Sequence, residues 1–178
     1  MNIQNGREDI VTPRLALIAI MPESVRSEQA NDRRLGLIAG ARVPAEWPPE
    51  HWEEQVFEVL LKQFAEDAES SAWNRYIALR DGSGERTLIG TLGGFRRAER
   101  PGECEIGYSV LPEFQGRGYA TEAARAFVAW VFAHPDIETI TAQTFPELTA
   151  SIRVMEKCGM SFDGAGYEER AILYRLRR

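Results

Sequence analysis

The stretch from Glu103 to Ala133 constrains the fold of this chain more than any other part of the sequence. It begins as a β-type segment, breaks at Pro112, passes through the glycine-containing loop Gln115–Ala120 and continues as an amphipathic helix. Apolar residues of that helix recur at the spacing of one buried face: Ala120, Ala123, Ala124, Phe127, Val128 and Val131. Residues 137–144 then form a β-branched segment, so the stretch predicts a right-handed strand–helix–strand crossover with a parallel strand pair.

The loop at the start of this helix indicates an anion-binding site. Gly116 and Gly118 permit a tight turn in which N–H groups without intrahelical partners converge on one anion, and the helix dipole adds to the attraction. The string GxxxxGK[ST] of a mononucleotide P-loop is absent, and Thr121 stands where a Rossmann fingerprint needs Gly or Ala. The lysine and HRD set of a kinase are also missing. These residues alone leave open a helix start whose glycines serve only the turn.

Several strings together resemble one family. The loop Gln115–Ala120 (QGRGYA) matches the Q/R-x-x-G-x-G/A signature of the GNAT N-acetyltransferases, and Glu105–Tyr108 resembles the strand that precedes it. Residues 150–160 (ASIRVMEKCGM) and the early Thr12–Leu15 are similar to the RimJ/RimL-like branch, which acetylates ribosomal-protein N-termini. Because these motifs follow the family order over nearly the whole chain, they are more specific together than any of them is alone.

The resemblance implies an α+β (three-layer α/β) acyl-CoA N-acyltransferase fold, with residues 1–178 as a single domain. Its sheet is mixed and mostly antiparallel, with about seven strands that splay at the fourth and fifth and about four flanking helices. The residue pattern predicts strands at 15–20, 74–80, 87–95, 103–111 and 137–144 and two short ones after Met160, the last at 171–176. Helices are expected at 22–36, 50–67 and 120–133, and from a capping box at Thr144 and Glu147 to Cys158.

Composition excludes several other classes of protein. The net charge of −6 argues against a broad nucleic-acid-binding surface. Two cysteines and two histidines provide neither a disulfide framework nor a zinc-ligand set, so no metal is expected. The N-terminus lacks an apolar signal region and no apolar run is long enough to span a membrane. We therefore expect a cytoplasmic protein that does not bind membranes, as a monomer or homodimer.

The resemblance also implies acetyl-CoA as the cosubstrate. Its pantetheine would pair with backbone groups near Val110 and Leu111, and its pyrophosphate would lie on the loop. The residues expected there are Gln115, Gly116, Arg117, Gly118, Tyr119 and Ala120, with Thr121 as a hydroxyl donor. For Arg117 the alternative is a solvated loop charge.

Acetyl transfer to an amine needs a proton acceptor, because an ammonium group with a pKa of about 8 to about 10 has no free lone pair. Glu105 matches the carboxylate that accepts this proton in the ribosomal-protein branch, and Glu103 is an alternative on the same strand face. Ser151 matches the serine proposed there to bond or protonate the leaving sulfur. Tyr108, on the opposite strand face from Glu105, is another candidate acid. Leu148 departs from the Asn usual in the branch, which weakens the role of Ser151.

The acceptor is the least constrained part of the prediction. Trp47 and Trp52, with Glu105, are candidates to line its site, although Trp47 could instead cover the edge of the core. Glutamates near the two tryptophans favour cationic acceptors, unless they are only a solvated helix face: Glu46, Glu50, Glu53 and Glu54. The predicted function is an N-acetyltransferase that moves the acetyl group of acetyl-CoA to a primary amine, a protein N-terminus or a small amine, by direct attack in a ternary complex. The alternative is a non-catalytic acyl-CoA-binding or regulatory module.

Overall fold

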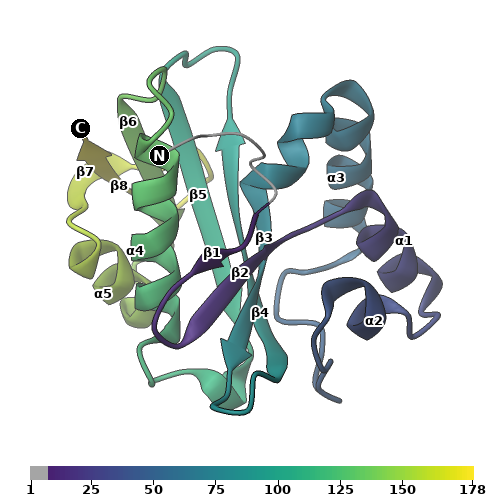
Figure 1. Cartoon of the computed structure of the whole chain (residues 1–178). Helices are drawn as coiled ribbons and strands as arrows, with labels where there is room; N and C mark the ends of the chain where they lie inside the picture. Colours follow the sequence, from purple (N-terminus) through teal and green to yellow (C-terminus); the bar gives the residue numbers. More distant parts are fainter. Residues whose placement is uncertain (1–7) are drawn as a thin grey trace. The chain divides into compact units, whose positions relative to one another are not determined.

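The structure, a computed structural model, describes residues 8–178. Two strands and three helices come first in this part of the chain, three strands follow, and the last part is a mixture of helices and strands (Figure 1). The strands are β1 (Ile10–Val11), β2 (Leu15–Ala19), β3 (Asn74–Arg80), β4 (Arg86–Arg96), β5 (Glu103–Val110), β6 (Thr139–Thr144), β7 (Ser161–Ala165) and β8 (Ile172–Arg177). The α-helices are α1 (Pro22–Ala30), α2 (Leu35–Ala39), α3 (Glu54–Glu66), α4 (Tyr119–Phe132) and α5 (Thr149–Lys157), and 3-10 turns occur at Ala68–Trp73 and Pro112–Phe114.

The strands are hydrogen-bonded in the order β1-β2-β3-β4-β5-β6-β8-β7. The β5–β6 ladder is parallel, whereas the ladders β1–β2, β2–β3, β6–β8 and β7–β8 are antiparallel. The chain divides into two compact units: the first extends to Leu92 and includes Ser109–Tyr119, and the second contains Gly93–Tyr108 and Ala120–Arg178. The predicted mixed, mostly antiparallel fold is confirmed, with one strand more than expected because Ile10–Val11 pairs with β2.

In the first unit, helices α1, α2 and α3 enclose an apolar core with strands of the sheet (Figure 1). Phe57, Leu60 and Phe64 lie on one face of α3 and are buried, as their spacing predicts. They belong to a cluster that also contains Ile20, Val25, Leu35, Ala39, Trp52, Tyr76, Ala78 and Leu88. Trp52 therefore anchors the proline-rich loop before α3 to the core.

In the second unit, the crossover helix α4 buries the face predicted from the sequence, including Phe127 and Val131. The two faces of β5 differ. Cys104 and Ile106 are buried and apolar, whereas Glu103 and Glu105 alternate with them and point to the other face. One side of this strand thus carries packing residues and the other carries carboxylates.

Two helix predictions need correction. The helix expected over residues 22–36 ends at Ala30, because Asn31 adopts a left-handed conformation with a φ of 48°, and a second short helix begins at Leu35. The capping box at Thr144 does not form. Thr144 is the last residue of β6 and pairs with Ile172 of β8, so α5 begins only at Thr149. Pairing with a strand distant in sequence wins over the local capping signal.

Candidate active site

The loop before α4 has the backbone shape that an anion site requires. Gly116 and Gly118 have φ values of 74° and 82°, in the left-handed region that other residues rarely adopt. Residues 115–118 are exposed, and α4 begins directly after them at Tyr119. The N–H groups of a first helical turn have no intrahelical acceptors. An exposed loop of this shape can therefore present backbone donors, the helix dipole and the Arg117 side chain to a phosphate.

Arg14 joins this loop from far away in the sequence. It lies at the β1–β2 turn, which is closed by the Thr12 hydroxyl accepting from Leu15 N–H at 2.9 Å. Its guanidinium donates to the Arg117 carbonyl at 3.0 Å and lies 4.5 Å from the centroid of the Tyr119 ring. The sequence motif contained Arg14 but gave no reason to place it here, because the contact spans 103 residues.

The backbone groups expected to pair with pantetheine have partners within the protein. Leu111 N–H donates to the Ile89 carbonyl at 2.8 Å, and the Val110 carbonyl accepts from the Gln115 side-chain amide at 2.8 Å. The Gln115 side chain is thus turned back toward β5. A ligand that used the Val110 carbonyl would have to displace it.

Strands β5 and β6 pair only over part of their length. The described pairs run from Glu103–Thr139 to Glu105–Thr141, whereas β5 continues to Val110 and β6 to Thr144. Parallel strands that remain side by side keep pairing, so the two strands separate after Glu105. This is the splay that the resemblance implies, and Glu105 lies at its origin.

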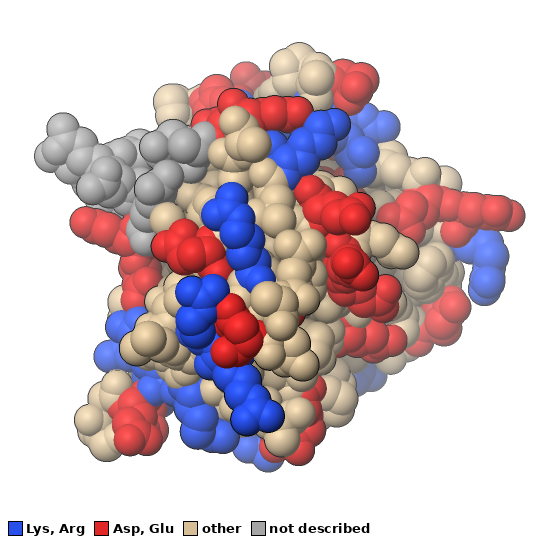
Figure 2. Space-filling model, turned by 90° about the vertical axis from the view of Figure 1, so that its right-hand side faces the viewer, with Lys and Arg blue, Asp and Glu red and all other residues tan. Residues whose placement is uncertain are grey.

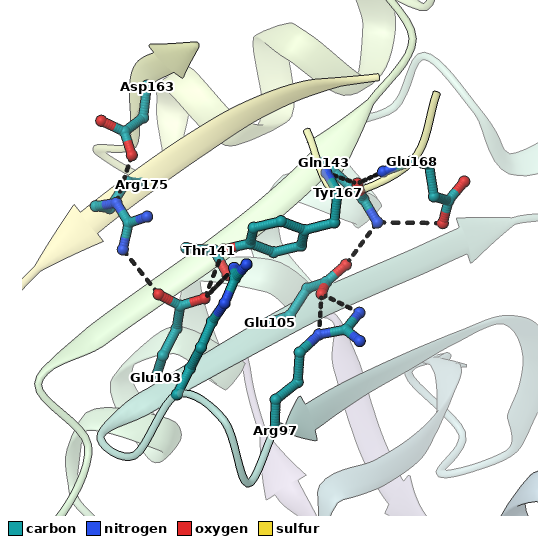
Figure 3. Close-up of polar contacts among 10 residues, drawn as sticks. Arg97, Glu103, Glu105, Thr141, Gln143, Asp163, Tyr167, Glu168 and Arg175 are labelled. Atoms are coloured by element: carbon teal, nitrogen blue, oxygen red, sulfur yellow. Dashed lines mark hydrogen bonds and ion pairs between the residues drawn. The ribbon is translucent and has the colours of Figure 1, made fainter. Parts of the chain in front are cut away.

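Glu105 is held by donors from strand β6 and from the residue that follows β4 (Figure 3). Arg97 donates to its Oε2 through Nε at 3.1 Å and Nη2 at 2.8 Å, and Gln143 donates to its Oε1 at 2.9 Å. The Glu105 side chain is 12% exposed. A carboxylate has about four acceptor positions, and these bonds use three of them. These bonds orient the Glu105 carboxylate and leave one acceptor position on Oε1.

Glu103 is bonded more completely than Glu105. Tyr167 Oη donates to its Oε1 at 2.6 Å and Arg175 donates to its Oε2 at 2.8 Å (Figure 3). Longer bonds of 3.4 Å come from Arg100 and Thr141. Four residues thus hold Glu103, three of them through Oε1, whereas two residues hold Glu105, so Glu103 is the more tightly engaged of the two sequence candidates.

Tyr108 and Ser151 meet on the other face of β5. The Tyr108 hydroxyl donates to the Ser151 carbonyl at 3.1 Å and lies 3.2 Å from the Ser151 hydroxyl. Burial raises the pKa of Tyr108 to about 12. The two alternative sulfur partners of the sequence prediction thus form one pair of neutral hydroxyls. Leu148, at the N-cap of α5, is 47% exposed and donates no side-chain bond to this pair.

Trp47 and Trp52 are occupied elsewhere. Both indole N–H groups donate to Glu28 Oε2, at 2.8 and 2.9 Å, and the Tyr76 hydroxyl donates to its Oε1. Burial raises the pKa of Glu28, while these three bonds act in the opposite direction. The rings of both tryptophans pack edge-on against Tyr76. This packing favours the alternative in which Trp47 covers the edge of the core, and Trp52 packs against the same core.

Neither cysteine is suited to be a nucleophile. Burial raises the pKa of Cys104 to about 12 and also raises the pKa of Cys158, so both remain thiols near neutrality. Among residues 8–178 no group of three or more His, Cys, Asp or Glu is arranged to hold a metal ion. In the same part of the chain no helix is long and apolar enough to cross a membrane.

The chain is similar to known proteins in sequence and in fold. The family model of the acetyltransferase (GNAT) domain matches residues 26–161. The uncharacterized N-acetyltransferase YnaD of Bacillus subtilis is 42% identical over 60 residues, which are 34% of this chain and 35% of that relative. The chain thus matches only about a third of the length of this curated relative.

Solved structures share the fold at low sequence identity. The ribosomal-protein-S5-alanine acetyltransferase of Vibrio fischeri superposes with a TM-score of 0.61 and 18% identity, covering 95% of this chain and 96% of the other. The microcin C7 self-immunity acetyltransferase MccE, solved with acetyl-CoA and AMP, has a TM-score of 0.62 and 14% identity, with 94% of both chains covered. These likenesses concern the fold.

Proposed function

Since the chain belongs to the GNAT acetyltransferase family and is an acyltransferase enzyme, we propose that it transfers the acetyl group of acetyl-CoA to a primary amine by direct attack in a ternary complex. The observation that carries this proposal is the separation of β5 from β6 after Glu105, with a carboxylate on one strand face and a hydroxyl pair on the other. An amine and a thiolate can then use opposite faces of the same strand.

At the cofactor end, the loop Gln115–Ala120 binds the pyrophosphate. The left-handed glycines, the start of α4 and Arg117 supply donors and positive charge, with Thr121 in the first helical turn as a further hydroxyl donor. Arg14 holds the loop through the Arg117 carbonyl and adds a second guanidinium nearby. Both glycines are required, because their φ values exclude side chains without strain.

At the acceptor end, Glu105 takes the proton of the amine, directly or through one water. A carboxylate is a suitable proton acceptor, and Oε1 has one acceptor position left beside the bond from Gln143. The neutral amine attacks the thioester carbonyl, the C–N bond forms and the C–S bond breaks. The second proton, which the nitrogen loses as it becomes an amide, passes to water. A protein N-terminus or a small amine satisfies this chemistry equally.

The leaving sulfur is stabilised by the hydroxyls of Tyr108 and Ser151. A phenol with a pKa of about 12 does not readily give its proton to a thiolate whose thiol has a pKa of about 8.5. Tyr108 therefore acts as a hydrogen-bond donor, and the thiolate leaves without complete protonation by this residue. The raised pKa values of Cys104 and Cys158 support direct attack over an acyl-cysteine intermediate.

The test is a free-thiol assay with acetyl-CoA and an amine library that includes peptides, polyamines and amino sugars, with acetylated product identified by mass spectrometry. The proposal predicts CoA release in proportion to acetylated amine. Gly118→Val should raise the KM for acetyl-CoA steeply, because its φ of 82° and the nearby Arg14 guanidinium leave a branched side chain strained. A folded Gly118→Val variant that binds acetyl-CoA as well as the parent would show that the loop has another role.

A further inference from the structure

Gln143, in β6, makes hydrogen bonds with every polar group of its side chain (Figure 3). Its Nε2 donates to Glu105 Oε1 at 2.9 Å and to Glu168 Oε1 at 3.1 Å. Its Oε1 accepts from Tyr167 N–H at 2.9 Å and Glu168 N–H at 3.2 Å. An amide has two donors and an acceptor oxygen with two lone pairs, so Gln143 is fully used.

These bonds join two parts of the second unit, which the Tyr167 hydroxyl also links through its bond to Glu103. One is the Glu105 carboxylate, and the other is the 166–171 turn between β7 and β8. The turn is closed by Gly166 N–H donating to the Ala171 carbonyl at 2.7 Å. A Cβ atom at Gly166 would lie 2.9 Å from Gln143 Oε1 and 2.7 Å from the Ala171 Cβ, so only glycine lets the turn sit on the Gln143 amide.

We propose that Gln143 is a positioning residue that couples the 166–171 turn to the Glu105 carboxylate and fixes the direction of that carboxylate. The inference rests on the proposed role of Glu105 as proton acceptor. The backbone N–H groups of the turn bond the Gln143 side-chain oxygen and so fix the plane of its amide. In that orientation one amide N–H points at Glu105 Oε1. If the turn moves away, the Gln143 amide can rotate, and Glu105 Oε1 loses the hydrogen bond from Gln143.

The charges around Glu105 make this donor important. Arg97 reaches Glu105 from the position directly after β4, and Glu168 approaches from the turn. Glu103 precedes Glu105 on the same face of β5. The guanidinium of Arg100 lies over the ring of Tyr167, with its central carbon 3.6 Å from the ring centroid. Gln143 stands between the carboxylates of Glu105 and Glu168 and bonds both, so it screens two like charges from each other.

Three variants separate the bonds between the turn and Gln143 from the bond between Gln143 and Glu105. Gln143→Glu keeps oxygens that can accept from the turn but loses the donor to Glu105 and adds a carboxylate beside it. Gln143→Met loses both sets of bonds at similar size. Gly166→Ala displaces the turn and leaves every group around Glu105 chemically unchanged. Thr141→Val is the matched control, because Thr141 lies on the same face of β6 but bonds Glu103.

The readouts are kcat/KM against pH, the KM for acetyl-CoA, and amide hydrogen exchange at residues 167 and 168. Gln143→Glu should move the acidic limb of the profile upward by about one pH unit, because a like charge favours protonation of Glu105, and should keep amide protection. Gln143→Met and Gly166→Ala should lower kcat about tenfold with the KM for acetyl-CoA unchanged, and should lose protection at both amides. Thr141→Val should match the parent.

The decisive comparison includes Glu105→Gln. If that variant is inactive while the profile of Gln143→Glu overlays that of the parent, the positioning role is wrong. The same holds if Gly166→Ala loses amide protection but keeps the parent's kcat and pH profile. If Glu105→Gln itself retains full activity, the proposed base is wrong and the coupling has no catalytic consequence, which also overturns the inference.

Discussion

Two carboxylates of this molecule, Glu28 and Glu105, each accept hydrogen bonds from several side chains, but their partners differ in charge. Glu28 accepts only from neutral donors, namely two indoles and a phenol, and burial raises its pKa. Glu105 accepts from the guanidinium of Arg97 and an amide, and it lies where two strands separate. The first carboxylate joins residues of a core, and the second is oriented at the point where two strands separate.

The contrast also concerns Trp47 and Trp52, the two aromatic residues that the sequence offered as candidates to line the acceptor site. Trp47 and Trp52 combine an apolar ring with one N–H donor, and in the structure each donor is used by Glu28. The pairing lets a proline-rich loop pack its two largest side chains into the first unit without leaving an indole N–H unpaired.

The largest expected effect concerns Glu28. Glu28→Ala leaves the N–H groups of Trp47 and Trp52 and the hydroxyl of Tyr76 without their acceptor, and each unpaired buried donor costs about 1 kcal/mol or more. We expect the free energy of unfolding to fall by about 3 kcal/mol, measured by urea denaturation, with kcat of the folded fraction unchanged. A variant as stable as the parent would remove the distinction between the two carboxylates.

The next effect concerns a residue near neither carboxylate. Arg14→Gln removes the bond to the Arg117 carbonyl and the cation above the Tyr119 ring. Because hydrogen bonds of charged groups contribute about 1.5 kcal/mol or more, the Kd for acetyl-CoA should rise about tenfold in titration calorimetry. Arg14→Lys keeps the charge but not the planar guanidinium, so its Kd for acetyl-CoA should lie between those of the parent and of Arg14→Gln. Equal affinities of all three proteins would exclude Arg14 from the cofactor loop.

A smaller effect is expected in the pH dependence of stability. The folded-state pKa of Glu28 is raised, so the folded protein binds this proton more tightly than the unfolded chain does. The contribution of Glu28 to stability is therefore fully present below its unfolded pKa and is lost as the pH rises through the folded pKa. Relative to Glu28→Gln, the parent should lose stability from about pH 4.5 upward through that window. An opposite slope in matched urea titrations would contradict the desolvation argument.

The smallest effect concerns exposed carboxylates, whose surroundings resemble neither those of Glu28 nor those of Glu105. Four of them lie around the loop before α3: Glu46, Glu50, Glu53 and Glu54. Figure 2 shows acidic side chains interspersed with Lys and Arg over the face that it presents. We expect kcat/KM for a basic peptide to fall only about twofold to threefold between low and physiological salt, and that for an acidic peptide to stay constant. Equal salt slopes would rule out electrostatic selection of the acceptor by this segment.

Local signals account for what the sequence predicted correctly. The buried face of α4 follows from its 3.6-residue spacing, and the left-handed turns at Gly116 and Gly118 follow from glycine itself. The mixed, mostly antiparallel fold and the family also followed from the sequence, and both are confirmed. The roles of Glu105, Ser151 and the loop residues stay predictions.

What the sequence did not reveal depends on sheet register. Arg97, Gln143 and Tyr167 come from three separate segments, and nothing local marks them as neighbours of Glu105 or Glu103. The antiparallel pairing of Thr144 with Ile172 likewise decides where α5 can begin. A sheet with charged residues on one face would have been a usable signal, because Glu103 and Glu105 alternate with buried residues along β5.

The central claim, that Glu105 is the proton acceptor, is tested most directly by kcat of Glu105→Gln as a function of pH, measured by CoA release with any amine that the parent acetylates. The account predicts a kcat about 10²-fold below that of the parent at neutral pH, with partial recovery at high pH as the free amine becomes abundant. Glu103→Gln, measured in parallel, should keep most of the rate per folded molecule. A Glu105→Gln variant within threefold of the parent at every pH, with Glu103→Gln impaired instead, would contradict the account.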